Sequence, residues 1–325
     1  MIPKSWFDAL EQADNQTPFA TVDNLSSFGF LPPRANSVHG MPIGFTVDRQ
    51  ADADFKVTGL RWYDGQKAGD GDAEPWVGMN CAACHTGSIS YKGKTIVVDG
   101  APSLVDFQSF VEGLDASLKA TRAQSDKWDR FNDKILNGKD TPANREKLTA
   151  AFDKLLAWQD KTDQMNETEM RYGYGRLDAV GHIFNKVLMF TGSGSEKGNE
   201  SNAPVSYPFL WNMWRQGHVQ WNGIAANSRL KLPGDALEYG ALGRNTGEVL
   251  GVFGDIDLTS QSGLFGSLKG YSSSVRPKNL MRLEIMLQSL TPPAWPEEFP
   301  PVDTQLVDEG SKLFAQKCAA CHKTP

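Results

Sequence analysis

Several stretches of the chain carry apolar residues three or four positions apart, a spacing that places them on one face of a helix. Thr141 and Pro142 open one such stretch, and threonine is a good N-cap while proline fits the first helical turn. The pattern therefore predicts amphipathic helices, over residues 5–12, 101–118, 141–164, 176–190, 278–290 and from 303 onward.

The helix expected over 176–190 has two unlike sides. Its apolar side includes Ile183 and Phe184, which we expect to face the core. Its polar side carries His182, Asn185 and Lys186, which we expect to face the solvent. A role for His182 at the protein surface is the interpretation that this pattern favours.

Signals for strands are sparse. Residues 89–99 alternate weakly around Lys92-Gly93-Lys94, which predicts a small hairpin. Residues 28–46 and 64–78 are rich in glycine or proline and are typical of ordered loops. Five prolines between 292 and 301 predict a semi-rigid linker. The expected fold is mainly α, with little β structure.

Length and charge limit the possible functions. A chain of 325 residues is long enough for two domains. Its net charge of −6 argues against binding nucleic acid, which needs a basic face. No apolar run is long enough to span a membrane, so we expect no membrane span.

All four cysteines lie in two copies of one pentapeptide, Cys81-Ala-Ala-Cys84-His85 and Cys318-Ala-Ala-Cys321-His322. Cys-x-x-Cys-His is the attachment motif of c-type haem. Its two thiols form thioethers with the vinyl groups of one haem, and the histidine that follows binds the iron. The sequence therefore predicts two covalently attached haem c groups, with His85 and His322 as iron ligands.

Two other interpretations of the cysteines are weaker. A thioredoxin-like Cys-x-x-Cys has no need of the histidine that follows it. A zinc site shared by four cysteines would have to join two motifs that lie at distant points of the chain. Bacterial haem c is attached outside the cytoplasm, so we expect a periplasmic or secreted protein. The chain shows no signal peptide and ends soon after His322, so we expect that it is a mature form or a fragment truncated at its C-terminus.

The second axial position of each iron decides between electron transfer and catalysis. His39 and Met41 lie in a loop from which either could reach a haem, although a hydrogen-bonding role in the loop is favoured. His218 lies in the most aromatic stretch, with Trp211, Trp214 and Trp221, where core packing, haem packing and electron relay are all open. Glu248 is a candidate for moving a proton between the two oxygens of peroxide, with a surface or salt-bridged glutamate as the alternative.

The order of these motifs resembles the dihaem cytochrome c peroxidase/MauG superfamily, and most of all its rubber-oxygenase branch. The two haem motifs lie farther apart than in the short peroxidases, which favours the longer branch. The resemblance extends from about Pro32 onward and is carried by the segments Asn80–Gly87, Gly175–Ala179, Ala203–Trp211, Gln220–Gly223, Arg244–Gly251 and Gly310–His322.

The resemblance implies an enzyme with cytochrome c-like haem domains that contain long helical and loop insertions. The haem on His85 would react with hydrogen peroxide or O2, and the haem on His322 would transfer electrons from a small cytochrome or cupredoxin donor. The catalytic candidates are Glu248, Trp221 and His218. The segments 208–212 and 221–223 resemble loops that line the reactive haem and the interface.

The expected domain division is an N-terminal haem c domain over 1–290, a proline-rich linker over 291–302, and the start of a second cytochrome c-like domain over 303–325. Two other functions remain open. One is a dihaem cytochrome that only transfers electrons, and the other is a dihaem oxygenase that acts on a hydrophobic substrate.

Overall fold

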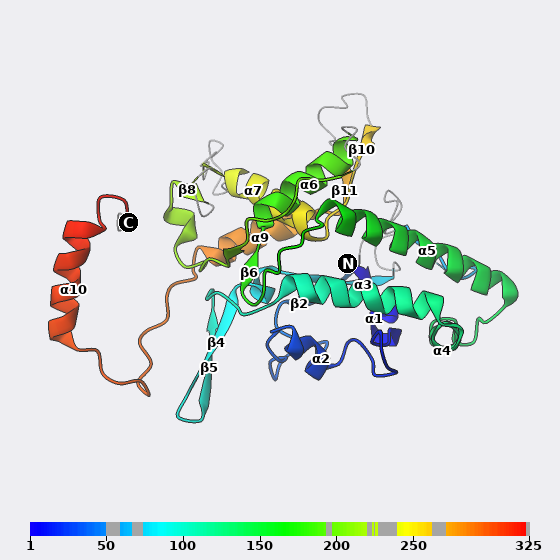
Figure 1. Ribbon diagram of the computed structural model, residues 1–325, viewed down its shortest axis with the longest axis horizontal. Coiled ribbons are helices and arrows are strands. Elements are labelled where there is room, and N and C mark those ends of the chain that lie inside the picture. The colour runs from blue at the N-terminus through cyan, green and yellow to red at the C-terminus, as the bar shows by residue number, and fades with distance from the viewer. Residues whose placement is uncertain are drawn as a thin grey trace.

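The computed structural model describes residues 1–49, 59–66, 74–192, 197–219, 223, 225–226, 239–261 and 271–322 (Figure 1). The helices of this part are α1 (Lys4–Ala9), α2 (Val22–Ser27), α3 (Phe107–Ala123), α4 (Ser125–Ile135), α5 (Pro142–Met165), α6 (Ala179–Thr191), α7 (Tyr239–Val252), α9 (Pro277–Leu287) and α10 (Thr304–Lys317). Short 3-10 turns cover Cys81–Ala83 (η1) and Met213–Arg215 (η2).

The strands form several small antiparallel sheets. One has three strands in the order β1 (Ile2–Pro3), β3 (Pro75–Met79), β2 (Phe45–Arg49). The others are pairs: β4 (Thr86–Tyr91) with β5 (Lys94–Asp99), β6 (Arg176–Leu177) with β7 (Val205–Ser206), β8 (His218–Val219) with β9 (Ala225–Ala226), and β10 (Ile256–Gln261) with β11 (Tyr271–Ser273).

The prediction of a mainly α fold with little β structure was wrong. Helices make up 45% and strands 14% of the structure, which is a mixed α/β composition with several small sheets. Most of these strands are too short to show alternation, and β1 and β3 pair across a long stretch of sequence. The predicted hairpin is confirmed as β4–β5, where Lys92 and Gly93 have φ of 48° and 79°, as a tight hairpin turn requires.

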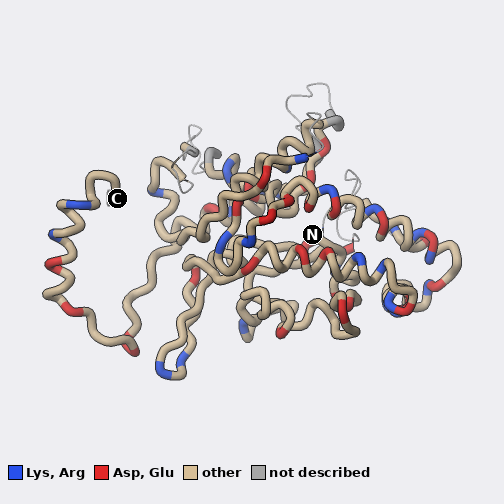
Figure 2. Tube along the Cα trace, viewed as in Figure 1, with Lys and Arg blue, Asp and Glu red and all other residues tan. Residues whose placement is uncertain are grey.

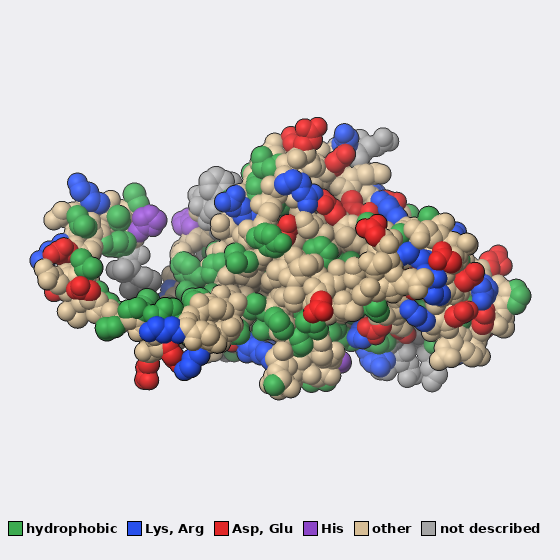
Figure 3. Space-filling model, turned by 60° about the horizontal axis from the view of Figure 1, so that its bottom comes forward, with side chains coloured by type: hydrophobic (Ala, Val, Ile, Leu, Met, Phe, Trp, Pro, Cys, Tyr) green, Lys and Arg blue, Asp and Glu red, His purple; other side chains and the backbone are tan. Residues whose placement is uncertain are grey.

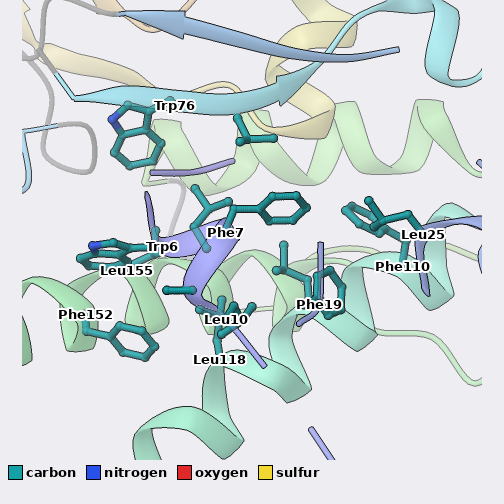
Figure 4. Packing of buried hydrophobic residues seen from close by; sticks show 14 of the residues in the cluster. Trp6, Phe7, Leu10, Phe19, Leu25, Trp76, Phe110, Leu118, Phe152 and Leu155 are labelled. Atoms are coloured by element: carbon teal, nitrogen blue, oxygen red, sulfur yellow. The ribbon is translucent and has the colours of Figure 1, made fainter. Parts of the chain in front are cut away.

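The core lies between the N-terminal segment, α3, α5 and strand β3 (Figure 4). Trp6 of α1 is fully buried and stacks on Phe152 of α5, with ring centroids 5.2 Å apart. Phe110 of α3 meets Phe30 of the loop before β2 edge to face at 5.1 Å. Aromatic rings from distant parts of the sequence therefore hold the body together. The predicted N-cap of α5 is confirmed, since the Thr141 side chain accepts from Asn144 N.

The orientation predicted for the sides of α6 was wrong. Asn185 and Lys186 are buried, whereas Phe184 is 59% exposed. The Asn185 side-chain nitrogen donates to Asn199 O at 2.8 Å and its oxygen accepts from Asn199 N at 2.8 Å. The Lys186 ammonium donates to Thr162 Oγ1 and lies over the Trp158 ring, 4.7 Å from its centroid. Partners from distant segments thus satisfy polar groups that the sequence pattern assigned to solvent.

The C-terminal segment stands apart from this body (Figures 1 and 3). After α9 the chain has no helix or strand until α10 begins at Thr304, with Asp303 as its N-cap. Leu306, Leu313 and Phe314 of α10 are between 40% and 65% exposed. The helix α10 therefore carries an apolar side that the described part of the chain does not cover.

Candidate functional site

The first cysteine motif forms a compact turn at the end of β3. The Asn80 side chain caps η1 by accepting from Ala82 N at 3.0 Å. The carbonyl of Cys81 accepts from the backbone N–H groups of both Cys84 and His85. All four cysteines of the chain are unpaired. The two thiols and the imidazole of this motif therefore project from a single turn.

Neighbouring segments hold the turn through its backbone. Asn80 N donates to Gly44 O at 2.8 Å, and Gly44 has a φ of +89°. A Cβ at Gly44 would fall inside contact distance of the Ala83 backbone, so a side chain has no room there. On the other side, Ser103 N donates to Cys84 O at 3.0 Å. The loop before β2 and the segment before α3 thus clamp the motif.

His85 is oriented by a backbone carbonyl. Its Nδ1 lies 2.7 Å from Pro208 O, and a carbonyl only accepts, so Nδ1 carries the proton. The lone pair then sits on Nε2, which is the atom that ligates iron. Burial lowers the pKa of His85, opposed by this hydrogen bond, and so favours the neutral ring that metal binding needs.

The thiols lie in a buried environment. Burial raises the pKa of Cys84 to about 12, and the Tyr207 hydroxyl lies within hydrogen-bonding reach of this thiol. Tyr207 also donates to Val105 O at 3.2 Å. Burial raises the pKa of Cys81 as well, and the charges of Glu284 and Glu248 act in the same direction. Redox-active cysteines have a lowered pKa, so this environment does not suit a thioredoxin-like role.

Helices α7 and α9 bring a charged cluster to this turn. Arg244 Nη2 lies 3.0 Å from Glu284 Oε1, and both side chains are nearly buried. Asn245 also donates to Glu284. Glu248, one helical turn after Arg244, is half-buried and near enough to both cysteines to affect their pKa values. The structure therefore places the predicted acid/base residue in the neighbourhood of the Cys81–His85 turn.

The other predicted residues, His218, Trp221 and His182, are not among the described contacts of the Cys81–His85 turn. His218 is exposed on β8, beside Gly223, and the described contacts of the Cys81–His85 turn do not include it. Trp221 lies outside the described residues. His182 is half-buried against Tyr172, and burial lowers its pKa to about 4, so the surface role expected for it was wrong.

Pro208 and Glu284 are the residues that add most to the site. The family resemblance pointed to Pro208 as the start of a segment that would line the reactive haem, but nothing in the sequence pattern indicated its hydrogen bond to His85. Glu284 is four residues after the buried Leu280, on the inward side of α9, and a carboxylate at such a position is a signal for a buried partner.

The second motif adopts the same turn. The Cys318 carbonyl accepts from Cys321 N at 3.1 Å and from His322 N at 2.8 Å. Cys321 and His322 are exposed at the end of α10. Both motifs thus present two thiols and an imidazole in one local geometry, the first clamped to the body and the second outside it.

These residues fit a haem c. Each turn offers two unpaired thiols followed by a histidine, and His85 has its ligating nitrogen set by Pro208. The macrocycle needs apolar contacts, and Leu104 and Phe209 are 69% and 50% exposed. Leu104 follows Ser103, and Phe209 follows Pro208, the two residues bonded to the turn. Apolar surface therefore adjoins the ligand set.

The chain is similar to an uncharacterized protein of Sinorhizobium fredii (strain NBRC 101917 / NGR234), y4iJ, with 31% identity over 345 aligned positions. The match covers all of this chain and 53% of the relative, so the chain spans about half the length of the curated relative it matches. No protein family model matches the chain, and neither does any solved structure. None of the described helices is both long and apolar enough to cross a membrane.

Proposed function

We propose that this chain is part of a dihaem c-type cytochrome oxidoreductase of the periplasm or cell exterior. One haem would be held by Cys81, Cys84 and His85, and the other by Cys318, Cys321 and His322. The observation that carries the proposal is the hydrogen bond from His85 Nδ1 to Pro208 O, because it prepares Nε2 for iron directly beside two unpaired thiols. The resemblance to the dihaem cytochrome c peroxidase/MauG superfamily supports the same proposal.

The reaction proposed at the His85 site is reduction of hydrogen peroxide, or activation of O2. Bound haem supplies an iron that takes a small oxidant and exchanges electrons. One hydrogen peroxide takes up two electrons and two protons and leaves as two molecules of water. The electrons would come from a small cytochrome or cupredoxin through the His322 site.

The chain's own residues supply position and protons. Pro208 O fixes the His85 ring, and the buried surroundings of Cys84 and Tyr207 keep water from that side of the turn. Glu248 is the candidate that gives and takes a proton at the oxidant, and the Arg244–Glu284 pair anchors α7, the helix that carries it, to α9. Arg244 and Glu284 are therefore positioning residues in this proposal.

Haem attachment is tested by producing the chain in a host with haem c attachment machinery and measuring its intact mass. We expect two haem additions, one lost in Cys81→Ser/Cys84→Ser and the other in Cys318→Ser/Cys321→Ser, so that each double variant is the control for the other. Four unmodified thiols in the wild-type chain would refute the proposal.

Catalysis is tested on the haem-loaded chain. Binding of cyanide or CO at one haem, with peroxide turnover from a reduced cytochrome, supports the peroxidase. Glu248→Gln should then lower turnover about 10²-fold or more while haem content stays unchanged, as expected when an acid/base group is lost. Two low-spin irons that bind neither ligand in any redox state would instead support a cytochrome that only transfers electrons. Ligand binding without peroxide turnover, together with oxygen uptake on an alkene substrate, would support the oxygenase.

A further inference from the structure

The proline-rich segment after α9 follows the hairpin β4–β5 from its base to its tip (Figure 1). At the base, a Cβ on Gly100 would lie 2.8 Å from Leu290 Cδ2, so Leu290 packs directly on the residue that follows β5. At the tip, the rings of Phe299 and Tyr91 meet edge to face with centroids 5.1 Å apart. The segment is therefore not a free linker but is docked at both ends of the hairpin.

Charges and a second ring reinforce the contact at the tip. Lys94 Nζ lies 2.8 Å from Glu298 Oε1. Trp295 packs edge to face on Phe299 at 5.2 Å, and its Nε1 donates to Pro300 O at 2.9 Å. Figure 2 shows basic positions at the hairpin tip and acidic ones on the nearby turn of the segment. We call the five residues Tyr91, Lys94, Trp295, Glu298 and Phe299 the clasp.

The clasp is the last fixed point before the second cysteine motif. Every residue from 300 to 317 is exposed, so α10 is not held by packing on the described body. At the other end of the hairpin, β4 begins at Thr86, directly after His85. The hairpin and the clasp therefore link His85 to Phe299, five residues before α10 begins at Thr304.

Release of the clasp would change the reach of the second motif. A segment of roughly ten residues spans about 17 Å as a flexible coil and more as an extended proline-rich chain, so its far end would sample a wide range of positions. Docked on the hairpin, the same segment has one path. Electron transfer between two haems falls steeply with their separation, so a wide range of positions would make it slow and heterogeneous.

We infer that Tyr91, Lys94, Glu298 and Phe299 are positioning residues that set the separation of the two haem-attachment turns. The part of this inference that concerns electron transfer rests on the proposed function. The part that concerns separation does not, because it needs only the folded chain.

The separation is measured by pulsed EPR between spin-labelled unnatural amino acids at two exposed positions, Lys154 on α5 and Lys312 on α10. The wild-type chain should give one narrow distance distribution. Tyr91→Ala/Phe299→Ala should raise the released population about fivefold to tenfold, as expected from loss of an aromatic pair. Equal distributions in these two proteins would overturn the inference.

Charge variants separate the clasp from general damage to the fold. Lys94→Glu should broaden the distribution, and Lys94→Glu/Glu298→Lys should narrow it again because the pair is restored with its charges exchanged. Glu297→Lys makes a similar charge change beside the pair and should have no effect. If the double variant does not narrow the distance distribution again, Lys94 and Glu298 are not positioning residues.

In the haem-loaded chain, electron transfer between the haems after flash reduction should become slower and multiphasic in Tyr91→Ala/Phe299→Ala and in Lys94→Glu. The double variant Lys94→Glu/Glu298→Lys should keep the wild-type rate. A chain that carries no haem would overturn the proposed function and leave the distance result standing. A haem-loaded chain whose distance distribution is unchanged in the ring and charge variants would overturn the inference about the clasp and leave the proposed function standing.

Discussion

Replacing Gly44 by alanine forces a methyl group into the backbone of the Cys81–His85 turn. The new Cβ would lie closer to Ala83 than 3.0 Å, a distance that real Cβ atoms essentially never show, and the atoms it meets are backbone atoms that cannot swing away. The positive φ of Gly44 adds about 1–2 kcal/mol of strain. Overpacking adds about 1–3 kcal/mol, so we expect a loss of about 3–4 kcal/mol in the free energy of unfolding.

Gly40→Ala is the matched control, because Gly40 lies in the same loop with a φ of +60° and has open space around it. It shares the backbone strain and the change in chain entropy but not the overlap. Urea unfolding should therefore show Gly44→Ala to be less stable than Gly40→Ala by about 2 kcal/mol. Equal losses in the two variants would refute the close approach of Gly44 to the turn.

Two buried charges give the remaining predictions. Arg130→Ala should lower the free energy of unfolding because it strips the buried Glu11 of two hydrogen bonds. Arg145→Ala, which breaks a more exposed pair with Asp140, should lower it less. The Arg130 hydrogen bond lowers the pKa of Glu11 below 4.5. The ionised Glu11 therefore stabilises the fold fully above pH 4.5, and this stabilisation is lost as the pH falls through the folded pKa. Arg130→Ala should remove that acid dependence from urea unfolding curves. Burial lowers the pKa of Lys186 from 10.5 to about 8. Between pH 8 and 10.5 the unfolded chain therefore binds one proton more than the folded chain, so the free energy of unfolding should rise by about 3 kcal/mol over this range. Lys186→Met should abolish this rise, and a Lys186→Met curve parallel to the wild-type curve would contradict the assigned burial.

The sequence predicted those features that depend on neighbouring residues. The N-cap at Thr141, the tight turn at Lys92 and Gly93 and the helix before Cys318 are set by local preferences, and all three are present. The spacing of Cys81, Cys84 and His85 likewise identified the candidate haem anchors without any tertiary information. Local patterns sufficed because each of these features is determined by residues only a few positions apart in the sequence.

Features that depend on distant partners were missed or reversed. Asn185 is buried because Asn199 completes its hydrogen bonds, and no period within α6 shows this. Glu284 is buried because Arg244, on another helix, pairs with it. The small sheets escaped prediction for the same reason, since β1 finds its partner only when β3 lies beside it.

The distance along the chain between His85 and its partner Pro208, 123 residues, sets the order in which the two residues are synthesised. A chain that is made from its N-terminus onward exposes Cys81 and Cys84 well before Tyr207 and Pro208 are present to enclose them. Under the proposed function, enzymes that attach haem would meet an open turn with accessible sulfur atoms, and the later segment would then enclose the attached group. The burial of these thiols in the folded protein is therefore no obstacle to the haem attachment proposed for them.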